Sequence, residues 1–227
     1  MSKEIFLVVE GATEQLFCER VLAPYMALSG VYVHASQIRK KGTNGGDVRF
    51  SRAKVSILGY LKQRADTLVG TFVDYYGLKE LPGLDVVRQT VNLPPLDVAL
   101  RLQNAAISEI EKLVPETEVR ARFFPFVSVH EFETLLFSNP QILADHLGVA
   151  VGKVKAILEA CGSPEQINNS PQTAPSKRIL SLASDAYGKT TDGVSIAARI
   201  GIDCMRRQCP IFDCWLNQLA SSASDHV

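Results

Sequence analysis

The sequence predicts an α/β protein in which a largely parallel sheet is flanked by helices and followed by a C-terminal helical extension. Short apolar stretches alternate with segments of helical periodicity over residues 1–137 of the 227, and this alternation is typical of parallel sheets covered on both faces. From residue 138 onward, short helical patterns are interrupted by Gly and Pro. We therefore expect an α/β core over 1–137 and a helical extension over 138–227 that packs on it.

The first half of the expected core contains two strands and two helices. Residues 5–9 form an apolar strand, and residues 14–28 follow with apolar positions at helical spacing. A second strand is expected over 31–35. A basic, glycine-rich loop over 39–46 then leads into a helix over 51–66.

The second half of the core contains two more apolar stretches. Residues 67–73 form the third expected strand, and residues 119–129 the fourth. Between them, residues 75–95 are rich in Gly and Pro and are expected to be mostly loop with one helical turn. Residues 96–113 form a long amphipathic helix.

Composition excludes several classes of protein. Lys plus Arg and Asp plus Glu each total 24, which excludes a histone-like polycation and an acidic disordered tail. No apolar run reaches the ~18–20 residues that cross a bilayer, so no membrane partner is expected. Five cysteines without a secretion signal favour a cytoplasmic location with reduced thiols.

Acidic residues follow three of the expected strands. Glu10 follows the first strand, Asp74 follows the third, and Glu131 and Glu133 follow the fourth. The C-terminal ends of parallel strands lie along one edge of a sheet, so these acids are expected to converge. Clustered carboxylates must raise their pKa values or bind a cation. Hard oxygen ligands favour Mg²⁺ or Mn²⁺, which commonly bind phosphate and activate water.

Each of these acids also has a structural interpretation. A single acid after a strand is often a helix cap or a solvated loop residue. Glu14 is explained by a favourable interaction with a helix macrodipole. For His130, an orienting or core role is favoured over metal ligation. The repetition at three strands is what favours a shared site.

Basic residues are the candidates for binding a phosphate backbone, although an ordinary solvated surface explains them as well. Lys177 is in addition a candidate for neutralising charge on a scissile phosphate. The candidate nucleic-acid-binding residues are Arg39, Lys40, Lys41, Lys177, Arg178 and Lys189.

Several motifs resemble a known family. The run from Val9 to Glu14 after an apolar strand, with Asp74 after another, resembles the Toprim domain. Residues 130–138, 175–179 and 209–216 are similar to a bacterial family of Toprim-like proteins of unknown function, related to the overcoming-lysogenization-defect nucleases. The resemblance covers essentially the whole chain and implies a Toprim/Rossmann-like fold.

The resemblance implies metal-dependent phosphodiester cleavage, with Mg²⁺ or Mn²⁺ as cofactor and DNA or RNA as substrate. Glu10 matches the glutamate after the first strand of the Toprim domain, and Asp74 matches the first residue of its Asp-x-Asp pair. Tyr76 stands where the second aspartate would be. Glu131 or Glu133 would supply the missing oxygen, and Glu131 is favoured because it is closer to the strand end.

The expected catalytic residues are therefore Glu10, Asp74, Glu131, Glu133 and Lys177, and the expected metal ligands are Glu10, Asp74 and Glu131. By analogy with related Toprim proteins, the expected partner is an ATPase in a phage-defence setting. The sequence leaves open whether the chain forms a homo-oligomer. The alternative function is a non-catalytic subunit that binds nucleic acid or docks on an ATPase, because Tyr76 makes the Toprim pattern incomplete.

Overall fold

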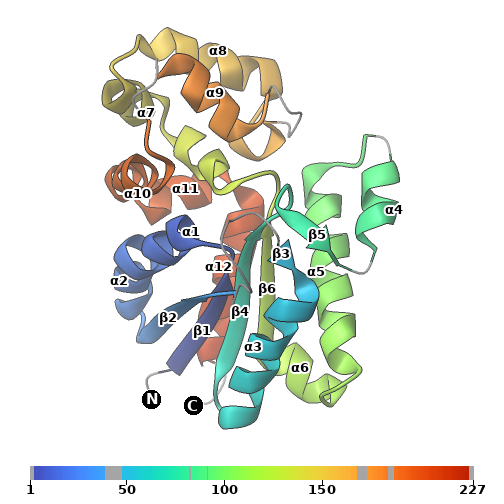
Figure 1. Ribbon diagram of the computed structural model, residues 1–227. Coiled ribbons are helices and arrows are strands. Elements are labelled where there is room, and N and C mark those ends of the chain that lie inside the picture. The colour runs from blue at the N-terminus through green and yellow to red at the C-terminus, as the bar shows by residue number, and fades with distance from the viewer. Residues whose placement is uncertain are drawn as a thin grey trace.

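Four parallel strands form the central sheet of the protein, shown as a computed structural model in Figure 1. The structure describes residues 3–38, 48–81, 83–90, 92–167, 173–183 and 187–224. The strand order is β2-β1-β4-β6, and every neighbouring pair runs parallel. The strands are β1 (Lys3–Val9), β2 (Val31–Gln37), β4 (Leu68–Asp74) and β6 (Phe123–Ser128). The predicted α/β class with a parallel sheet is confirmed.

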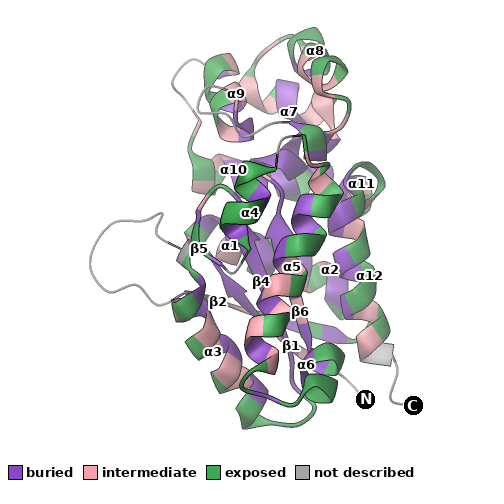
Figure 2. Cartoon of the chain, turned by 90° about the vertical axis from the view of Figure 1, so that its right-hand side faces the viewer, coloured by how far each residue is buried: buried purple, intermediate pink, exposed green. Residues whose placement is uncertain are grey.

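Burial along the strands follows from their place in the sheet. Every residue of β4 is buried, because a central strand of a parallel sheet has helices on both faces and needs apolar side chains throughout. β2 lies at the edge of the sheet, and its first four residues alternate between buried and exposed. Figure 2 shows the strands as the buried centre of the molecule between exposed helix surfaces.

Helices cover both faces of the sheet. On one face, Thr71 and Val127 face α3 (Phe50–Gln63) and α5 (Pro95–Glu111). On the opposite face, Phe126 stacks on Trp215 of α12 (Pro210–Ser224), with ring centroids 4.8 Å apart. The indole Nε1 of Trp215 donates a hydrogen bond of 3.0 Å to the carbonyl oxygen of Phe124. The last described helix of the chain is therefore part of the layer that covers the sheet.

The same face as α12 carries the first helical segment. That segment comprises α1 (Ala12–Phe17), the π-helix η1 (Cys18–Leu22) and α2 (Ala23–Ala27). The expected single helix over 14–28 is thus continuous in direction but contains one wider turn. A small second sheet pairs β3 (Val48–Arg49) with β5 (Leu78–Glu80), followed by α4 (Leu84–Gln89).

Above the C-terminal edge of the sheet lies a group of mostly short helices, seen at the top of Figure 1. They are η2 (Phe132–Ser138), α7 (Pro140–Leu147), α8 (Val151–Cys161), η3 (Pro164–Gln166), α9 (Pro175–Leu182), α10 (Lys189–Ile200) and α11 (Ile202–Gln208), where η2 and η3 are 3-10 helices. The expected helical extension is present, and the boundary at residue 137 stays a prediction. None of the described helices combines the length and apolar character needed to cross a bilayer.

The structure corrects two expected elements. The strand expected from residue 119 begins at Phe123, because α6 (Glu116–Arg122) precedes it. This helix has acids in its first turn and arginines in its last, which suits the macrodipole, and Arg120 pairs with Glu116 one turn away. The segment expected to be mostly loop contains β5 and α4. The basic loop over 39–46, with Arg39, Lys40 and Lys41, lies outside the described residues.

Candidate functional site

Glu10 and Asp74 lie beside each other at the C-terminal edge of the sheet. β1 and β4 are neighbours in parallel register, and the backbone N–H of Asp74 donates a 3.2 Å hydrogen bond to Glu10 Oε2. Gly77, in the turn after β4, packs against the same carboxylate of Glu10. A Cβ atom at Gly77 would lie 2.5 Å from Glu10 Oε1, so only glycine lets the turn pack against this carboxylate.

Glu14 approaches the same edge from the first turn of α1. Its side chain is buried, and its negative charge raises the pKa of Asp74. The start of α1 is tied to the start of α10 by a 2.9 Å hydrogen bond between the hydroxyls of Thr13 and Thr190. The helix that carries Glu14 and the helix that carries Lys189 therefore meet above the strand ends.

Glu133 belongs to η2, which follows β6. Its side chain is 0% exposed, and its Oε2 lies 3.2 Å from Lys189 Nζ. Burial raises the pKa of Glu133 to about 7, although Lys189 acts in the opposite direction. Within the described part of the chain, neither carboxylate oxygen of Glu133 has a hydrogen-bond partner.

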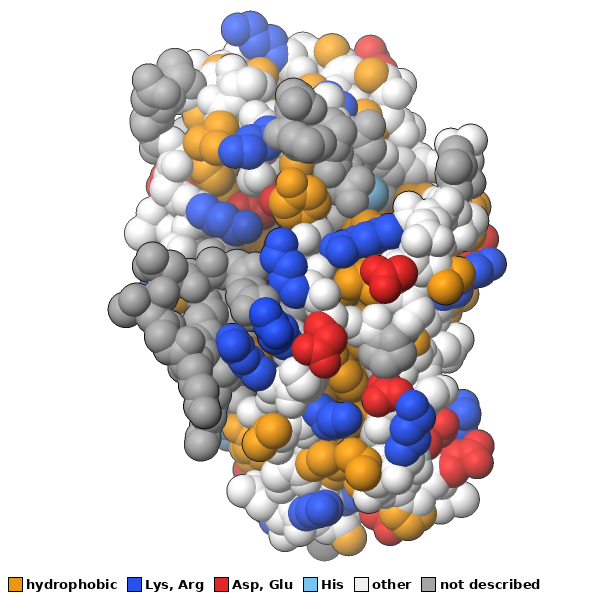
Figure 3. Space-filling model, turned by 45° about the vertical axis from the view of Figure 1, so that its right-hand side comes forward, with side chains coloured by type: hydrophobic (Ala, Val, Ile, Leu, Met, Phe, Trp, Pro, Cys, Tyr) orange, Lys and Arg blue, Asp and Glu red, His pale blue; other side chains and the backbone are white. Residues whose placement is uncertain are grey.

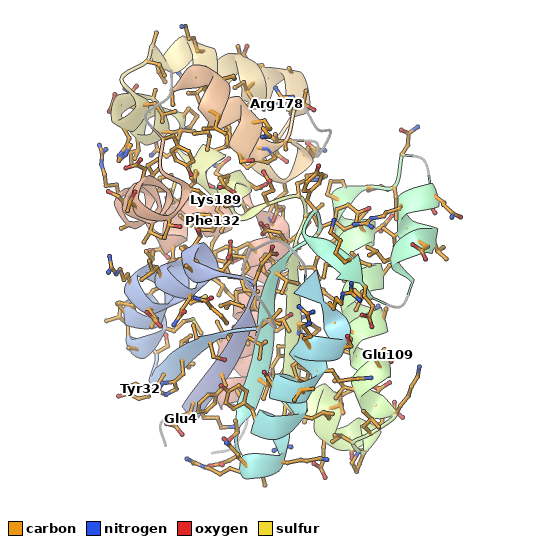
Figure 4. The ribbon with its side chains drawn as sticks, viewed as in Figure 1. Glu4, Tyr32, Glu109, Phe132, Arg178 and Lys189 are labelled. Carbon is orange, nitrogen blue, oxygen red and sulfur yellow. The ribbon has the colours of Figure 1, made fainter. Side chains whose placement is uncertain are left out.

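Lys189 is the first residue of α10. A cation in the first turn opposes the helix macrodipole, so helix stability does not explain this lysine. Burial lowers its pKa, but the charges of Asp74 and Glu133 raise it more, and the resulting pKa lies above the ordinary value. Figure 4 shows Lys189 beside Phe132 of η2, above the strand ends.

The charges of the neighbouring acids all affect the pKa of Asp74. Burial raises its pKa well above the usual range, and the charges of Glu14, Glu10 and Glu133 raise it further while Lys189 lowers it. Asp74 Oδ1 is buried and has no hydrogen-bond partner among the described residues. We call Glu10, Glu14, Asp74 and Glu133 the acid cluster.

The acid cluster fits a hard divalent cation by its chemistry. All its donors are carboxylate oxygens, and the buried oxygens of Asp74 and Glu133 lack hydrogen-bond partners in the described chain. In the described ranges, no three Asp, Glu, His or Cys side chains are already arranged around a common centre. The ammonium of Lys189 is the positive charge that the structure places among these carboxylates.

Glu131 lies close to this cluster but is engaged elsewhere. Its Oε2 accepts a 2.9 Å hydrogen bond from the backbone N–H of Ser176 in the first turn of α9. Asp74 is influenced by the charge of Glu133, and the cation of the cluster contacts Glu133. The sequence favoured Glu131 as the ligand because it is nearer to the strand end, and that choice stays a prediction; the structure pairs Lys189 with Glu133.

His130 stands in an unusual backbone conformation between β6 and these glutamates. Its φ is +87°, which is strained for a residue with a side chain. Its carbonyl oxygen accepts a 3.3 Å hydrogen bond from the N–H of Tyr76. Burial lowers the pKa of the imidazole to about 4. The backbone of His130 thus holds the neighbouring turn, while its buried Nδ1 has no hydrogen-bond partner among the described residues, so the expected orienting role stays a prediction.

Of the predicted nucleic-acid-binding residues, the structure describes Lys177, Arg178 and Lys189. Lys177 is exposed on α9, and Arg178 donates a 2.9 Å hydrogen bond from Nε to the carbonyl oxygen of Thr173. Lys189, expected to bind nucleic acid, is instead paired with Glu133. The cation beside the acids is therefore Lys189, and the role of Lys177 in neutralising a scissile phosphate stays a prediction.

Glu14 is the residue of the cluster that the sequence analysis set aside. Its position suits the helix macrodipole, which is a sufficient explanation for an isolated acid. The available signal was its spacing from Glu10. A strand-end acid and an acid in the first turn of the following helix both lie at the C-terminal edge of a parallel sheet. The four-residue spacing of Glu10 and Glu14 fits this arrangement.

Comparisons with known proteins describe the chain as follows. The model of a family described as "Domain of unknown function (DUF4276)" matches residues 9–220. No curated protein matches the chain. The chain is similar to a solved structure, the C-terminal region of the Burkholderia pseudomallei OLD protein, at a TM-score of 0.44 and 17% identity, covering 98% of this chain and 100% of that one. At this level, the similarity assigns no role to any residue.

Proposed function

The chain belongs to the family described as Domain of unknown function (DUF4276), and within it we propose that this protein is a divalent-metal-dependent nuclease. The observation that supports this most is the buried acid cluster. Asp74 Oδ1 and both carboxylate oxygens of Glu133 are buried without a hydrogen-bond partner in the described chain, and burial raises the pKa values of Asp74 and Glu133. Perturbed acids that converge from separate segments are characteristic of functional sites.

Glu10, Glu14, Asp74 and Glu133 are the residues that we assign to holding the cation. Magnesium or manganese, when bound, supplies Lewis-acid activation of a phosphate and of water. The backbone N–H of Asp74 and the close packing of Gly77 hold Glu10 in place. This assignment also agrees with the Toprim resemblance, which matches Glu10 and Asp74 to acids of that domain.

Lys189 and Glu131 have supporting roles in this proposal. Lys189 balances the negative charge of the cluster before the cation binds, through its ion pair with Glu133, and then lies close enough to the same edge to interact with a phosphate. Glu131 fixes the start of α9 through the N–H of Ser176. Lys177, the next residue of α9, is exposed, and we assign it to contact with a phosphate backbone.

The direct test is divalent-dependent cleavage by purified protein. Glu10→Gln and Asp74→Asn are each expected to reduce cleavage of plasmid DNA or single-stranded RNA to background, because each removes a charged ligand. The exposed Glu159 on α8 offers a matched control, and Glu159→Gln should cut at the wild-type rate.

The choice of metal gives a second measurement. Magnesium or manganese should support cleavage, whereas calcium should bind without turnover, because calcium accepts looser oxygen geometry than in-line phosphoryl chemistry requires. Full activity in a chelator, or wild-type cutting by Asp74→Asn, would reject the proposal.

A non-catalytic role in binding nucleic acid or an ATPase is the second candidate. Two observations favour it: Tyr76 occupies the position of an expected acid, and the described residues include no preformed group of three metal-ligating side chains. Crystals soaked in manganese distinguish the two functions. An ion among Glu10, Asp74 and Glu133 favours the nuclease, and an empty cluster at millimolar manganese favours the binding module.

A further inference from the structure

Tyr76 is an exposed aromatic residue held beside the acid cluster. It lies between Asp74 and Gly77, which both contact Glu10, and its side chain is 46% exposed. The backbone N–H of Tyr76 donates a 3.3 Å hydrogen bond to the carbonyl oxygen of His130. The ring is thus attached to a fixed turn while its surface remains in contact with solvent.

The neighbouring surface carries positive charge. Arg88 of α4 lies over the ring of Tyr75 at 5.8 Å and donates a 2.8 Å hydrogen bond to the carbonyl oxygen of Leu78. Lys79 on β5 and Arg49 on β3 are also exposed, and β3 and β5 pair directly. Figure 3 shows Lys and Arg side chains across the middle of the face that these elements present.

We propose that Tyr76 stacks on an unpaired base of the substrate, so that the protein selects single-stranded nucleic acid over duplex. The proposal rests on the proposed function because it assigns the substrate of the same site. An exposed ring can stack on a base only when that base is free of its own stack, and such stacking tolerates every base. We assign the backbone of that strand to the surface that carries Arg49, Lys79 and Arg88, because backbone contacts from Lys and Arg are independent of sequence.

The replacement of an expected acid by Tyr76 then has a chemical reason. The position two residues after Asp74 contributes to recognition of the substrate, while Glu14 and Glu133 add their carboxylates to those of Glu10 and Asp74. A tyrosine is suitable for this position because its aromatic ring can stack on a base while its hydroxyl remains hydrated.

Binding without metal tests this inference separately from catalysis. A labelled single-stranded DNA and its duplex are titrated against the full chain in chelator, and fluorescence anisotropy is measured. The single strand should bind about tenfold or more tightly than the duplex. Tyr76→Ala should remove about tenfold or more of that affinity, within the range of one lost stacking contact. Tyr76→Phe should bind as the wild type does.

Tyr32 provides the matched control. Its side chain is 50% exposed on β2, near the end of the sheet away from the acid cluster (Figure 4), and Tyr32→Ala should leave binding unchanged. Equal affinity for single strand and duplex, unchanged binding by Tyr76→Ala, or no binding of either substrate would overturn the inference. Tyr76-dependent binding without any cleavage in manganese would retain the stacking role and reject the nuclease proposal.

Discussion

Glu133 is fully buried, and in the described part of the chain its carboxylate has the ion pair with Lys189 but no hydrogen-bond partner. A buried charge of this kind costs free energy of folding unless it is well paired. The pKa of about 7 shows that the ion pair compensates only part of the burial. Gln at this position would keep the shape and remove the charge, so the retained acid is consistent with a function that needs it.

The pH dependence of stability follows from this pKa. The folded-state pKa of about 7 lies above the ordinary 4.5, so the contribution of Glu133 to stability is fully present below pH 4.5 and is lost as the pH rises through 7. In metal-free buffer, the wild type should lose about 3 kcal/mol relative to Glu133→Gln across this interval. Urea unfolding of both proteins at a series of pH values measures the difference.

Manganese provides the control for that measurement. A cation in the cluster favours ionised Glu133, so manganese should reduce the pH-dependent difference between the two proteins. A difference that stays constant from pH 4.5 to pH 8 in metal-free buffer would show that Glu133 has no raised pKa.

Metal affinity separates Glu133 from Glu131. Glu133→Gln should weaken manganese binding more than Glu131→Gln, because Glu131 already accepts a hydrogen bond from Ser176. Tyr76→Asp should be tolerated and should tighten manganese binding by adding an oxygen ligand, while it weakens binding of single-stranded DNA. Calorimetric titration of manganese into the three variants checks the order. Affinity equal to that of the wild type in both glutamate variants would mean that neither is a ligand.

At the scale of elements, the sequence predicted the strands better than the segments between them. The strands at 5–9, 31–35 and 67–73 were predicted because buried parallel strands are short apolar runs. α6 was missed because Val119 continues the apolar run of β6, and its helical character depends on charges placed at its two ends. Convergence of Glu10 and Asp74 follows from parallel topology alone. The pairing of Glu133 with Lys189 was not predictable, because it depends on how η2 and α10 pack.

α12 provides a prediction at this scale. The buried Glu165 of η3 accepts hydrogen bonds of 3.0 and 3.1 Å from the N–H groups of Ile211 and Phe212 in its first turn, and burial raises the pKa of Glu165 to about 7. Glu165→Gln replaces one acceptor with an amide donor and leaves a buried N–H unpaired. It should lower the free energy of unfolding by about 1–3 kcal/mol. Urea unfolding measures this, with Glu159→Gln as the exposed control; equal effects of the two changes would contradict it.

Considering the whole molecule, the C-terminal segment is required to complete the core. Trp215 of α12 packs on Phe126 and Phe72 of the sheet and on Phe212 of its own helix. Aromatic side chains contribute much of the apolar area buried in a core. Without α12, this face of β4 and β6 would be exposed to water.

Removal of α12 should therefore abolish the folded state. A chain that ends before Pro210 should bind a hydrophobic dye, lose its near-ultraviolet circular dichroism and unfold without a cooperative transition. Trp215→Phe is the milder comparison, because it keeps an aromatic ring in the core but loses the hydrogen bond to Phe124 and part of the buried indole area, at a cost of about 1–3 kcal/mol. Cooperative unfolding of the shortened chain at the wild-type midpoint would show that residues 1–209 fold alone.

The order in which the chain leaves the ribosome has a consequence for the acid cluster. Its carboxylates come from residues 10, 14, 74 and 133, while the lysine beside them is residue 189 and the helix that seals the sheet begins at Pro210. Domains generally fold as units during synthesis. A nascent chain therefore carries its acids long before it has the lysine and the covering helix. The acid cluster is therefore complete, with its lysine and the covering helix, only after the segment that begins at Pro210 has been synthesised.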